Sequence, residues 1–324
     1  MMHAALETAG EIVDITSELG WVSRILDEGS DGALQTPDVD STVTVRVESE
    51  RGPFPLAGLM VLTRGAWAGS GVLVMEDACG TGFDLRVTVA TDRPDFTFRW
   101  RPTPRRRLER TALPSRFHLL ARALLVQYPV LWWSSARGRA PLHAIACTAG
   151  AAVPLLAGPG GVGKSTLLES EMAAGASAAS DNLSVSDGHT VWGLVEPMRI
   201  EGAQGRQMTH GRSERALEGR VAHLRPDRIV VVSRGAADTA SLDLCDPATA
   251  ARSLVTGTYM AGELRRFWPF AATLAAGTGC GPSHPPVLET ARGLVARLPC
   301  YELRLPRRPG TRLTHILNPM EAIA

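Results

Sequence analysis

The chain has 324 residues, of which 44% are hydrophobic and 21% are charged. These values are typical of globular proteins, so wholesale disorder is excluded, and the length allows two domains. A net charge of +1 excludes the strongly basic profile of a dedicated nucleic-acid binder. Five cysteines without a C-x-x-C pair argue against a disulfide framework and a zinc ribbon, and favour a reducing, cytoplasmic setting.

The sequence shows neither a membrane span nor an export signal. Glu7, Glu11 and Asp14 lie where an export signal needs a basic end and an apolar run. The stretch 140–163 lacks acidic residues and arginine and is long enough to span a bilayer, but prolines and glycines interrupt it. We therefore expect no membrane partner.

Residues 1–112 predict a β-rich N-terminal region. The segments 43–47 and 83–89 alternate between apolar and polar residues, and 71–75 is a short apolar run. Turn-forming residues separate these runs, so we expect several short strands in one sheet or a small sandwich. No motif within 11–98 points to chemistry.

An arginine-rich linker follows at 99–110, with six arginines and two prolines in twelve residues. Charge runs of this kind are usually solvated connectors. The alternative is an arm that faces an anion, either an acidic peptide or a phosphate group. Nucleic acid is less favoured because the rest of the chain does not share the basic charge.

The second part of the chain, 113–324, alternates predicted helices and strands. Helical spacing predicts a helix over 114–128, followed by a polar turn at 134–139. The apolar runs 142–147 and 153–157 predict a hairpin. Further predicted elements are a helix over 165–173 ended by Gly175, a strand up to Ser180, a hairpin turn at 187–188, a strand over 228–233, helices over 246–256 and 285–295, and a strand over 299–305.

The strongest motif is the segment from Gly158 to Ser165, which reads G-P-G-G-V-G-K-S and fits the phosphate-binding loop pattern. Its glycines let backbone N–H groups converge on phosphate oxygens, and the helix that follows directs its positive end at the same anions. Lys164 is the only lysine in the chain. We expect Lys164 to reach the β- and γ-phosphates and the Ser165 hydroxyl to bind Mg²⁺. The predicted nucleotide-binding residues are Gly158, Gly160, Gly161, Val162, Gly163, Lys164, Ser165 and Thr166.

The acidic residue that should accompany this loop occurs at an unusual position in the sequence. The apolar run 229–232 ends in Ser233 and Arg234, without the Asp that holds Mg²⁺ in common P-loop ATPases. An Asp instead follows early, at Asp181, 16 residues after Ser165. Its spacing allows two readings: a carboxylate facing the γ-phosphate, as Mg²⁺ ligand or general base, or a simple turn cap.

The loop and its surroundings resemble the catalytic domain of the HPr kinase/phosphorylase family, whose core is akin to that of PEP carboxykinase. The resemblance rests on His143 upstream of the loop, on the loop itself, on the pair Asp181-Asn182, and on the final strand in 298–306. The resemblance covers roughly residues 113–305. The final strand is similar to that of the family's stand-alone members, which are often encoded beside peptide natural-product genes. The resemblance implies an α/β fold: a P-loop kinase core with a mixed sheet, carried by residues 113–324.

The resemblance also implies roles for individual residues. Asp181 and Lys164 would be catalytic, and His143 would tune the proton affinity of Asp181 or contact phosphate, although a His in an apolar strand is more often structural. The implied Mg²⁺ ligands are Ser165, Asp181, Asn182 and Glu196. The family has a second Asp where this chain has Asn182, which can bind Mg²⁺ through its carbonyl oxygen but cannot act as a base.

The function implied is an ATP- and Mg²⁺-dependent kinase acting on a Ser or Thr hydroxyl of a peptide or small protein. We expect the polar stretch 204–215 to be a mobile loop over the site, whose Arg206 or Arg212 stabilises the transferring phosphate. Two alternatives stay open: a small-molecule hydroxyl kinase, and a non-catalytic nucleotide sensor in which Asn182 explains the lack of turnover. A homo-oligomer is a candidate assembly, although the family's C-terminal assembly signature is missing.

Overall fold

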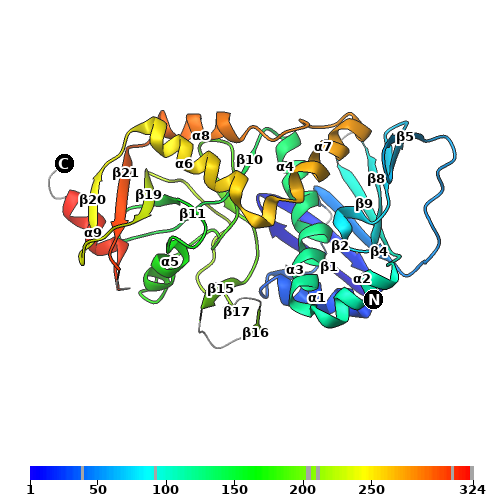
Figure 1. The fold of residues 1–324 in the computed structure, drawn as a ribbon, viewed down its shortest axis with the longest axis horizontal. Helices are drawn as coiled ribbons and strands as arrows, with labels where there is room; N and C mark the ends of the chain where they lie inside the picture. Colours follow the sequence, from blue (N-terminus) through cyan, green and yellow to red (C-terminus); the bar gives the residue numbers. More distant parts are fainter. Residues whose placement is uncertain (38–39, 91–92, 202–205, 209–211, 308–309, 322–324) are drawn as a thin grey trace. The chain divides into compact units, whose positions relative to one another are not determined.

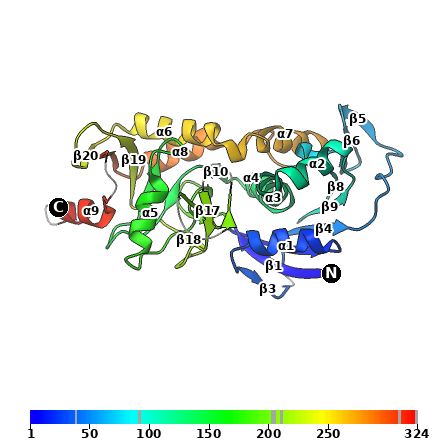
Figure 2. The ribbon, with the colours of Figure 1, turned by 60° about the horizontal axis from the view of Figure 1, so that its bottom comes forward.

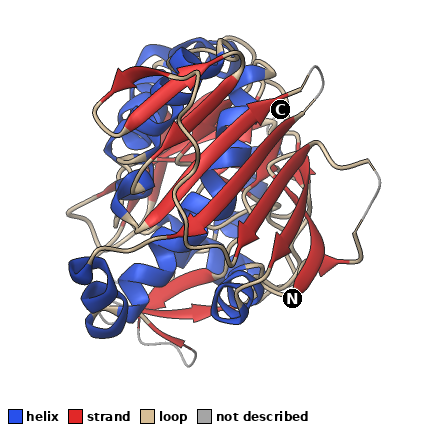
Figure 3. Cartoon of the chain, turned by 90° about the vertical axis from the view of Figure 1, so that its right-hand side faces the viewer, coloured by secondary structure: helices blue, strands red, loops and turns tan. Residues whose placement is uncertain are grey.

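The computed structural model describes residues 1–324 except 38–39, 91–92, 202–205, 209–211, 308–309 and 322–324 (Figure 1). Two compact units make up the chain. Unit 1 consists of 1–137, 207–210 and 266–285, and unit 2 of 138–206, 211–265 and 286–324. Each unit combines helices and strands, so the fold is mixed α/β (Figure 3).

Within the described residues, unit 1 is built on a nine-stranded mixed sheet with the order β3-β1-β2-β4-β9-β8-β7-β6-β5. Its strands are β1 (Met2–Thr8), β2 (Glu11–Ser17), β3 (Leu34–Gln35), β4 (Val43–Glu48), β5 (Met60–Thr63), β6 (Ala66–Gly69), β7 (Val72–Met75), β8 (Phe83–Val89) and β9 (Pro94–Trp100). The strands predicted at 43–47, 71–75 and 83–89 correspond to β4, β7 and β8. Strand β4 pairs in parallel with both β2 and β9, which places it in the sheet interior.

Helices pack on this sheet through large apolar side chains. They are α1 (Gly20–Gly29), the short turn η1 (Ala78–Gly80), α2 (Pro104–Ala112), α3 (Pro114–Arg122), the π-helical segment η2 (Ala123–Gln127), α4 (Tyr128–Ala136) and α7 (Phe267–Thr278). Helix α4 contacts β2 and β4, and α7 contacts β6, β7 and β8. Trp132 of α4 is fully buried, with its ring 5.8 Å from that of Phe96 in an edge-to-face arrangement. Truncating an aromatic core residue of this kind costs about 3–5 kcal/mol.

This packing explains two differences from the sequence predictions. Helix α4 continues to Ala136, so the polar turn predicted at 134–139 is wrong for its first residues. The segments 113–137 and 266–285 belong to unit 1, although the sequence assigned them to the second region. The run of helix from 114 to 136 buries Phe117, Leu124 and Trp132 within unit 1, and sequence periodicity cannot reveal which sheet covers such a face.

As far as unit 2 is described, its main sheet has five strands in the order β11-β12-β19-β21-β20. They are β11 (Ile145–Ala146), β12 (Pro154–Ala157), β19 (Arg228–Arg234), β20 (Ser241–Leu244) and β21 (Cys300–Leu305). Strands β12, β19 and β21 run parallel, and β11 forms the predicted hairpin with β12. The other strands of unit 2 are β10 (Ala140–Leu142), β13 (Ser184–Ser186), β14 (Val191–Gly193), β15 (Met198–Glu201), β17 (Arg212–Arg215) and β18 (His223–Leu224). Strand β16 (Arg206–Gln207) belongs to unit 2 through Arg206 alone.

Helices cover both faces of this five-stranded sheet. They are α5 (Lys164–Met172), α6 (Pro247–Met260) and α9 (Leu313–Glu321), while the turn η4 (Gly262–Leu264) and α8 (Val287–Val295) pack on α6. Leucines of α5 and α9 join Leu156, Val230 and Val232 in one apolar core. Helix α6 packs against β12, β19, β21 and α8. Figures 1 and 2 show α6 beside α8. The helices predicted at 165–173, 246–256 and 285–295 are confirmed as α5, α6 and α8.

Three details of unit 2 differ from the predictions. His143 lies in the bend between β10 and β11 and not in a strand. The strand predicted to end at Ser180 is absent from the described chain, because Ala178 makes only isolated bridges there. The hairpin β13–β14 forms as predicted, but its loop spans 187–190 and not two residues.

Candidate functional site

The loop predicted to bind phosphate, 158–165, leaves the carboxyl end of β12 and enters α5. Gly158, Gly161 and Gly163 have φ angles of 142°, 77° and 115°, which residues with a Cβ rarely adopt. Gly158 is also required by packing, since a Cβ there would lie 2.7 Å from the carbonyl oxygen of Val232 in β19. The strand-loop-helix order and these conformations agree with the loop predicted from the sequence.

The other side of the loop is open. A Cβ placed on Gly160 or Gly161 would meet nothing within 4 Å, so space for a ligand lies above the backbone here. Helix α5 begins at Lys164, directly after Gly163, and its first N–H groups carry the positive end of the helix dipole. Val162 lies in the apolar core below and anchors the loop. An anion is the ligand that this arrangement favours.

Lys164 lies within the loop and is only 5% exposed. Its Nζ donates to the carbonyl oxygens of Gly158, at 2.7 Å, and Pro159, at 3.1 Å. Burial lowers the pKa of Lys164 from its ordinary 10.5 to about 8, against the opposing effect of Asp181 and Glu263. The ammonium group therefore stands close to two carboxylates and is held in place by the loop itself.

Asp181 is buried beside the first turn of α5. Its Oδ2 accepts a hydrogen bond from the backbone N–H of Arg199 at 3.2 Å. Its Oδ1 is buried and has no hydrogen-bond partner among the described residues. Burial raises the pKa of Asp181, while the Ser165 hydroxyl and the N–H of Arg199 lower it. The carboxylate thus has one free oxygen and an increased proton affinity.

Arg199 organises the acidic side of the site. Its Nη2 lies 2.6 Å from Oε2 of Glu196, and its Nη1 lies 3.0 Å from Oε1 of Glu263. Burial and the flanking carboxylates act in opposite directions on Arg199, and the net effect raises its pKa. Asn182 donates from Nδ2 to Oε1 of Glu196 at 3.2 Å. That hydrogen bond orients the Asn182 amide with its nitrogen toward Glu196.

His143 is held by α6. Its backbone N–H donates to the Thr258 hydroxyl at 3.0 Å, and its Nδ1 is buried without a hydrogen-bond partner in the described chain. Burial first, and then the charge of Lys164, lowers the pKa of His143 to about 4, partly offset by Glu263. The imidazole is therefore neutral at pH 7, and a neutral ring can accept or donate but brings no positive charge.

The structure brings most of the predicted site residues together. Lys164, Ser165, Asp181, Asn182 and Glu196 are linked by the hydrogen bonds and electrostatic effects above. The carboxylate of Glu196 is engaged by Asn182 and Arg199, which gives it a structural task whether or not it also binds metal.

The stretch predicted as a mobile loop, 204–215, is only partly described. Residues 204–205 and 209–211 and the side chain of Arg206 lie outside the described part of the chain. Arg212 belongs to β17, which pairs with β15, so the loop prediction is wrong at this position. Its Nη2 lies 3.8 Å from Oε1 of Glu201, and none of its described contacts reaches the phosphate-binding loop.

Several residues of the site could not be found from the sequence. Arg199, Glu263 and Gly257 follow no motif and are distant from the loop along the chain. Arg234 occupies the place where common P-loop ATPases have an acid, so the sequence pattern gives it no role at the site. Its guanidinium lies against Gly163, 3.1 Å from where a Cβ would be, and its Nη1 donates to the carbonyl of Pro306. Arg234 is therefore a second cation beside the loop.

The residues present fit a nucleotide with its magnesium ion. The open glycine backbone and Lys164 suit phosphates, and the unpaired Oδ1 of Asp181 is a buried acceptor that a cation would satisfy. Among the described residues no group of three or more His, Cys, Asp or Glu forms a metal site. A metal here would therefore depend on Asp181, on neutral oxygens from Ser165 and Asn182, and on the phosphates, as is usual for Mg²⁺.

No protein-family model matches the chain, and no curated protein sequence matches it significantly. Within the described ranges, no helix has both the length and the apolar character needed to cross a bilayer.

Replacing Gly257 of α6 by Ala tests how closely this helix supports the loop. The new Cβ would lie 3.2 Å from the carbonyl oxygen of Gly158, which Lys164 uses as an acceptor. We expect ATP affinity to fall by about three- to tenfold, because a shift of a few tenths of an ångström misaligns the loop. Isothermal titration calorimetry with ATP measures this fall.

The matched control is Thr256→Ala, one residue earlier on the exposed side of α6. Because Ala favours helix over Gly by about 1 kcal/mol, the Gly257→Ala protein should retain its helix content in circular dichroism. An unchanged ATP affinity in Gly257→Ala would show that α6 does not position the loop.

Proposed function

We propose that unit 2 binds ATP with Mg²⁺ and transfers the γ-phosphoryl group to a hydroxyl, that of a Ser or Thr in a peptide or small protein. The observation that carries the proposal is the buried pair formed by Lys164 in the loop and Asp181 beside it. A loop of this kind with a single lysine provides phosphate binding, and the carboxylate provides a base at the same place. The resemblance to HPr kinase/phosphorylase supports a P-loop kinase core and is the basis for choosing a peptide acceptor.

The binding step follows from the loop. Backbone N–H groups of 160–165 would hold the β- and γ-phosphates, and the ammonium of Lys164 would exchange its carbonyl acceptors for phosphate oxygens. Arg234 lies on the other side of Gly163 and would add positive charge near the same phosphates. Among the candidate ligands, Ser165 and Asn182 would hold Mg²⁺, which when bound neutralises the charge of the phosphates, and Asp181 would be left to act as the base.

The transfer step assigns the proton to Asp181. The acceptor oxygen forms a bond with the γ-phosphorus while the bond from that phosphorus to the bridging oxygen of ADP breaks. The hydroxyl proton passes to the carboxylate of Asp181, whose Oδ1 has no hydrogen-bond partner in the described chain. The raised pKa of Asp181 makes it a better proton acceptor than an exposed carboxylate. The neutral His143 and the pair Arg199–Glu263 would maintain the local charge balance.

The test supplies the purified full chain with Mg²⁺ and γ-labelled ATP in lysate of its source organism. Label on a peptide or small protein, removed by phosphatase treatment, is the expected result. Label on a small molecule would indicate the alternative class, a small-molecule hydroxyl kinase. ATP binding without any transfer of label would contradict the kinase and favour the nucleotide sensor, in which Asn182 replaces the second acid.

A further inference from the structure

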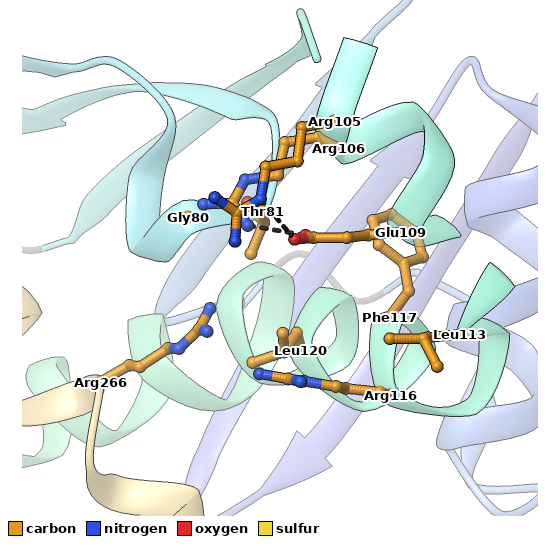
Figure 4. Close-up of a pocket in the computed structure, with 10 residues that line it drawn as sticks. All are labelled: Gly80, Thr81, Arg105, Arg106, Glu109, Leu113, Arg116, Phe117, Leu120 and Arg266. Atoms are coloured by element: carbon orange, nitrogen blue, oxygen red, sulfur yellow. Dashed lines mark hydrogen bonds and ion pairs between the residues drawn. The ribbon is translucent and has the colours of Figure 1, made fainter. Parts of the chain in front are cut away.

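Unit 1 contains a cavity of about 240 Å³ that has no part in the site of unit 2 (Figure 4). It lies between η1, the helices α2 and α3, and the residue before α7. Four cationic side chains line it: Arg105, Arg106, Arg116 and Arg266. Two of them come from the arginine-rich linker that the sequence left open as either a solvated connector or an anion-facing arm.

Positive charge exceeds negative charge in this cavity. Glu109 is the one acidic residue among those that line it, and it pairs with Arg105 at 3.2 Å and Arg106 at 2.7 Å. Arg116 and Arg266 have no ion pair with a carboxylate among the described residues. Figure 4 shows their side chains extending toward one another beneath the group around Glu109. Arg106 also pairs with Asp77 at 3.4 Å, so four arginines face two carboxylates and the excess is two positive charges.

The backbone of η1 is shaped to hold these cations close. Asp77 and Cys79 have positive φ angles of 44° and 53°, which residues other than glycine seldom adopt. Gly80 follows with φ of 67°, and a Cβ there would lie 2.7 Å from Nη2 of Arg106 and 3.7 Å from Nη1 of Arg266. The Arg266 guanidinium also donates to the carbonyl of Cys79. The turn thus holds two guanidinium groups close to Gly80, and Asp77 and Glu109 balance the charge of Arg106.

The rest of the lining is apolar and sets the chemical class of the ligand. Leu113, Phe117 and Leu120 line the cavity from α3 and from the residue before it. The cavity is smaller than the ~300–1,000 Å³ typical of a site for a whole drug-sized ligand, so it suits one or two side chains. A bare phosphate would leave the apolar part in contact with water. An acidic side chain next to an apolar one would satisfy both parts.

We propose that this cavity binds an acidic peptide segment, in which an Asp or Glu pairs with Arg116 and Arg266 and a neighbouring apolar side chain packs on Leu113 and Leu120. The inference concerns unit 1 alone and does not depend on the kinase function proposed for unit 2. The linker arginines Arg105 and Arg106 line the cavity but pair with Glu109, so the ligand is assigned to Arg116 and Arg266.

Calorimetric titration of the full chain tests the proposal with two synthetic peptides and one small anion. The first peptide is acetyl-Gly-Asp-Leu-Glu-Leu-Gly-amide, the second has Asn and Gln in place of Asp and Glu, and the small anion is inorganic phosphate. We expect the acidic peptide to bind at least about tenfold more tightly than its neutral counterpart, and more weakly at high salt. Equal affinity for the two peptides would overturn the proposal, as would phosphate binding as tightly as the acidic peptide.

Variants locate the site. Arg116→Gln should weaken the acidic peptide about tenfold, since it removes a charge-assisted hydrogen bond from an exposed residue that the fold does not need. Leu113→Ser should weaken the peptide and leave phosphate unaffected. The matched control is Arg107→Gln, an equal loss of charge on α2 in a residue that lines a different hollow. An equal effect of Arg107→Gln would show that general attraction, and not this cavity, binds the peptide, and would overturn the proposal.

Discussion

Asp181→Asn should lower the rate of phosphoryl transfer by at least about a hundredfold while ATP still binds. A general base contributes about 10²- to 10⁴-fold to such reactions, and the amide keeps the shape of the carboxylate but cannot accept the proton. We expect the dissociation constant for ATP to change by about threefold or less, because Lys164 and the loop are untouched. Single-turnover transfer of labelled phosphate and calorimetric ATP binding separate the two effects.

Asp238→Asn, in the exposed segment after β19, is the matched control and should behave as the unsubstituted protein. The pH profile provides a second criterion: transfer should fall on the acid side through a pKa above that of an exposed Asp, because burial raises the pKa of Asp181. Undiminished transfer by Asp181→Asn would exclude Asp181 as the base. Joint loss of binding and transfer would instead assign it to holding the metal.

ATP affinity should fall steeply above pH 8 because of Lys164. Below its pKa of about 8 the amine is charged in the free protein, so affinity is nearly independent of pH. Above that pH each unit makes the charged form about tenfold rarer, and affinity should fall by up to about tenfold per unit. Titrations of ATP binding between about pH 7 and 9.5 measure this fall. Lys164→Arg keeps its charge over this range, so whatever ATP binding it retains should lack the fall.

The same pKa predicts the opposite sign for stability. The unfolded chain holds the Lys164 proton up to about pH 10.5, while the folded, ligand-free chain releases it above about pH 8. The unfolded state therefore binds more protons within this window, so the contribution of Lys164 to stability increases as the pH rises through it. Chemical unfolding of the unsubstituted protein and of Lys164→Met at several pH values isolates this contribution.

For the ATP-affinity prediction, an affinity that is flat across pH 8 would refute the predicted role of the Lys164 amine.

The sequence identified those parts of the candidate site that are contiguous or locally patterned. The loop is one segment with fixed residue types, and Asp181 follows it at a spacing that one helix and a short return can cover. The strand expected before Asp181 is missing, yet the chain arrives at the same place through the isolated bridges of Ala178.

Other features depend on contacts between distant segments, which a single sequence does not display. Glu263 reaches Arg199 only after α6 has packed against the main sheet of unit 2. In unit 1 the arginine-rich linker was visible, but Arg266, which lines the same cavity, lies far along the chain. The parallel pairing of β4 with β2 and β9 is equally invisible, since alternation predicts strands and not their neighbours.

The burial of Lys164 has a consequence for covalent chemistry. It is the only side-chain amine in the sequence, and its lowered pKa leaves a larger neutral fraction at mild alkaline pH than an exposed lysine has. Acylating reagents that attack neutral amines would therefore modify one side chain, at the bottom of the phosphate-binding loop. A bound anion that pairs with the charged amine would protect Lys164 from acylation. The protein thus carries a single natural reporter, readable by mass spectrometry, of whether this loop is occupied.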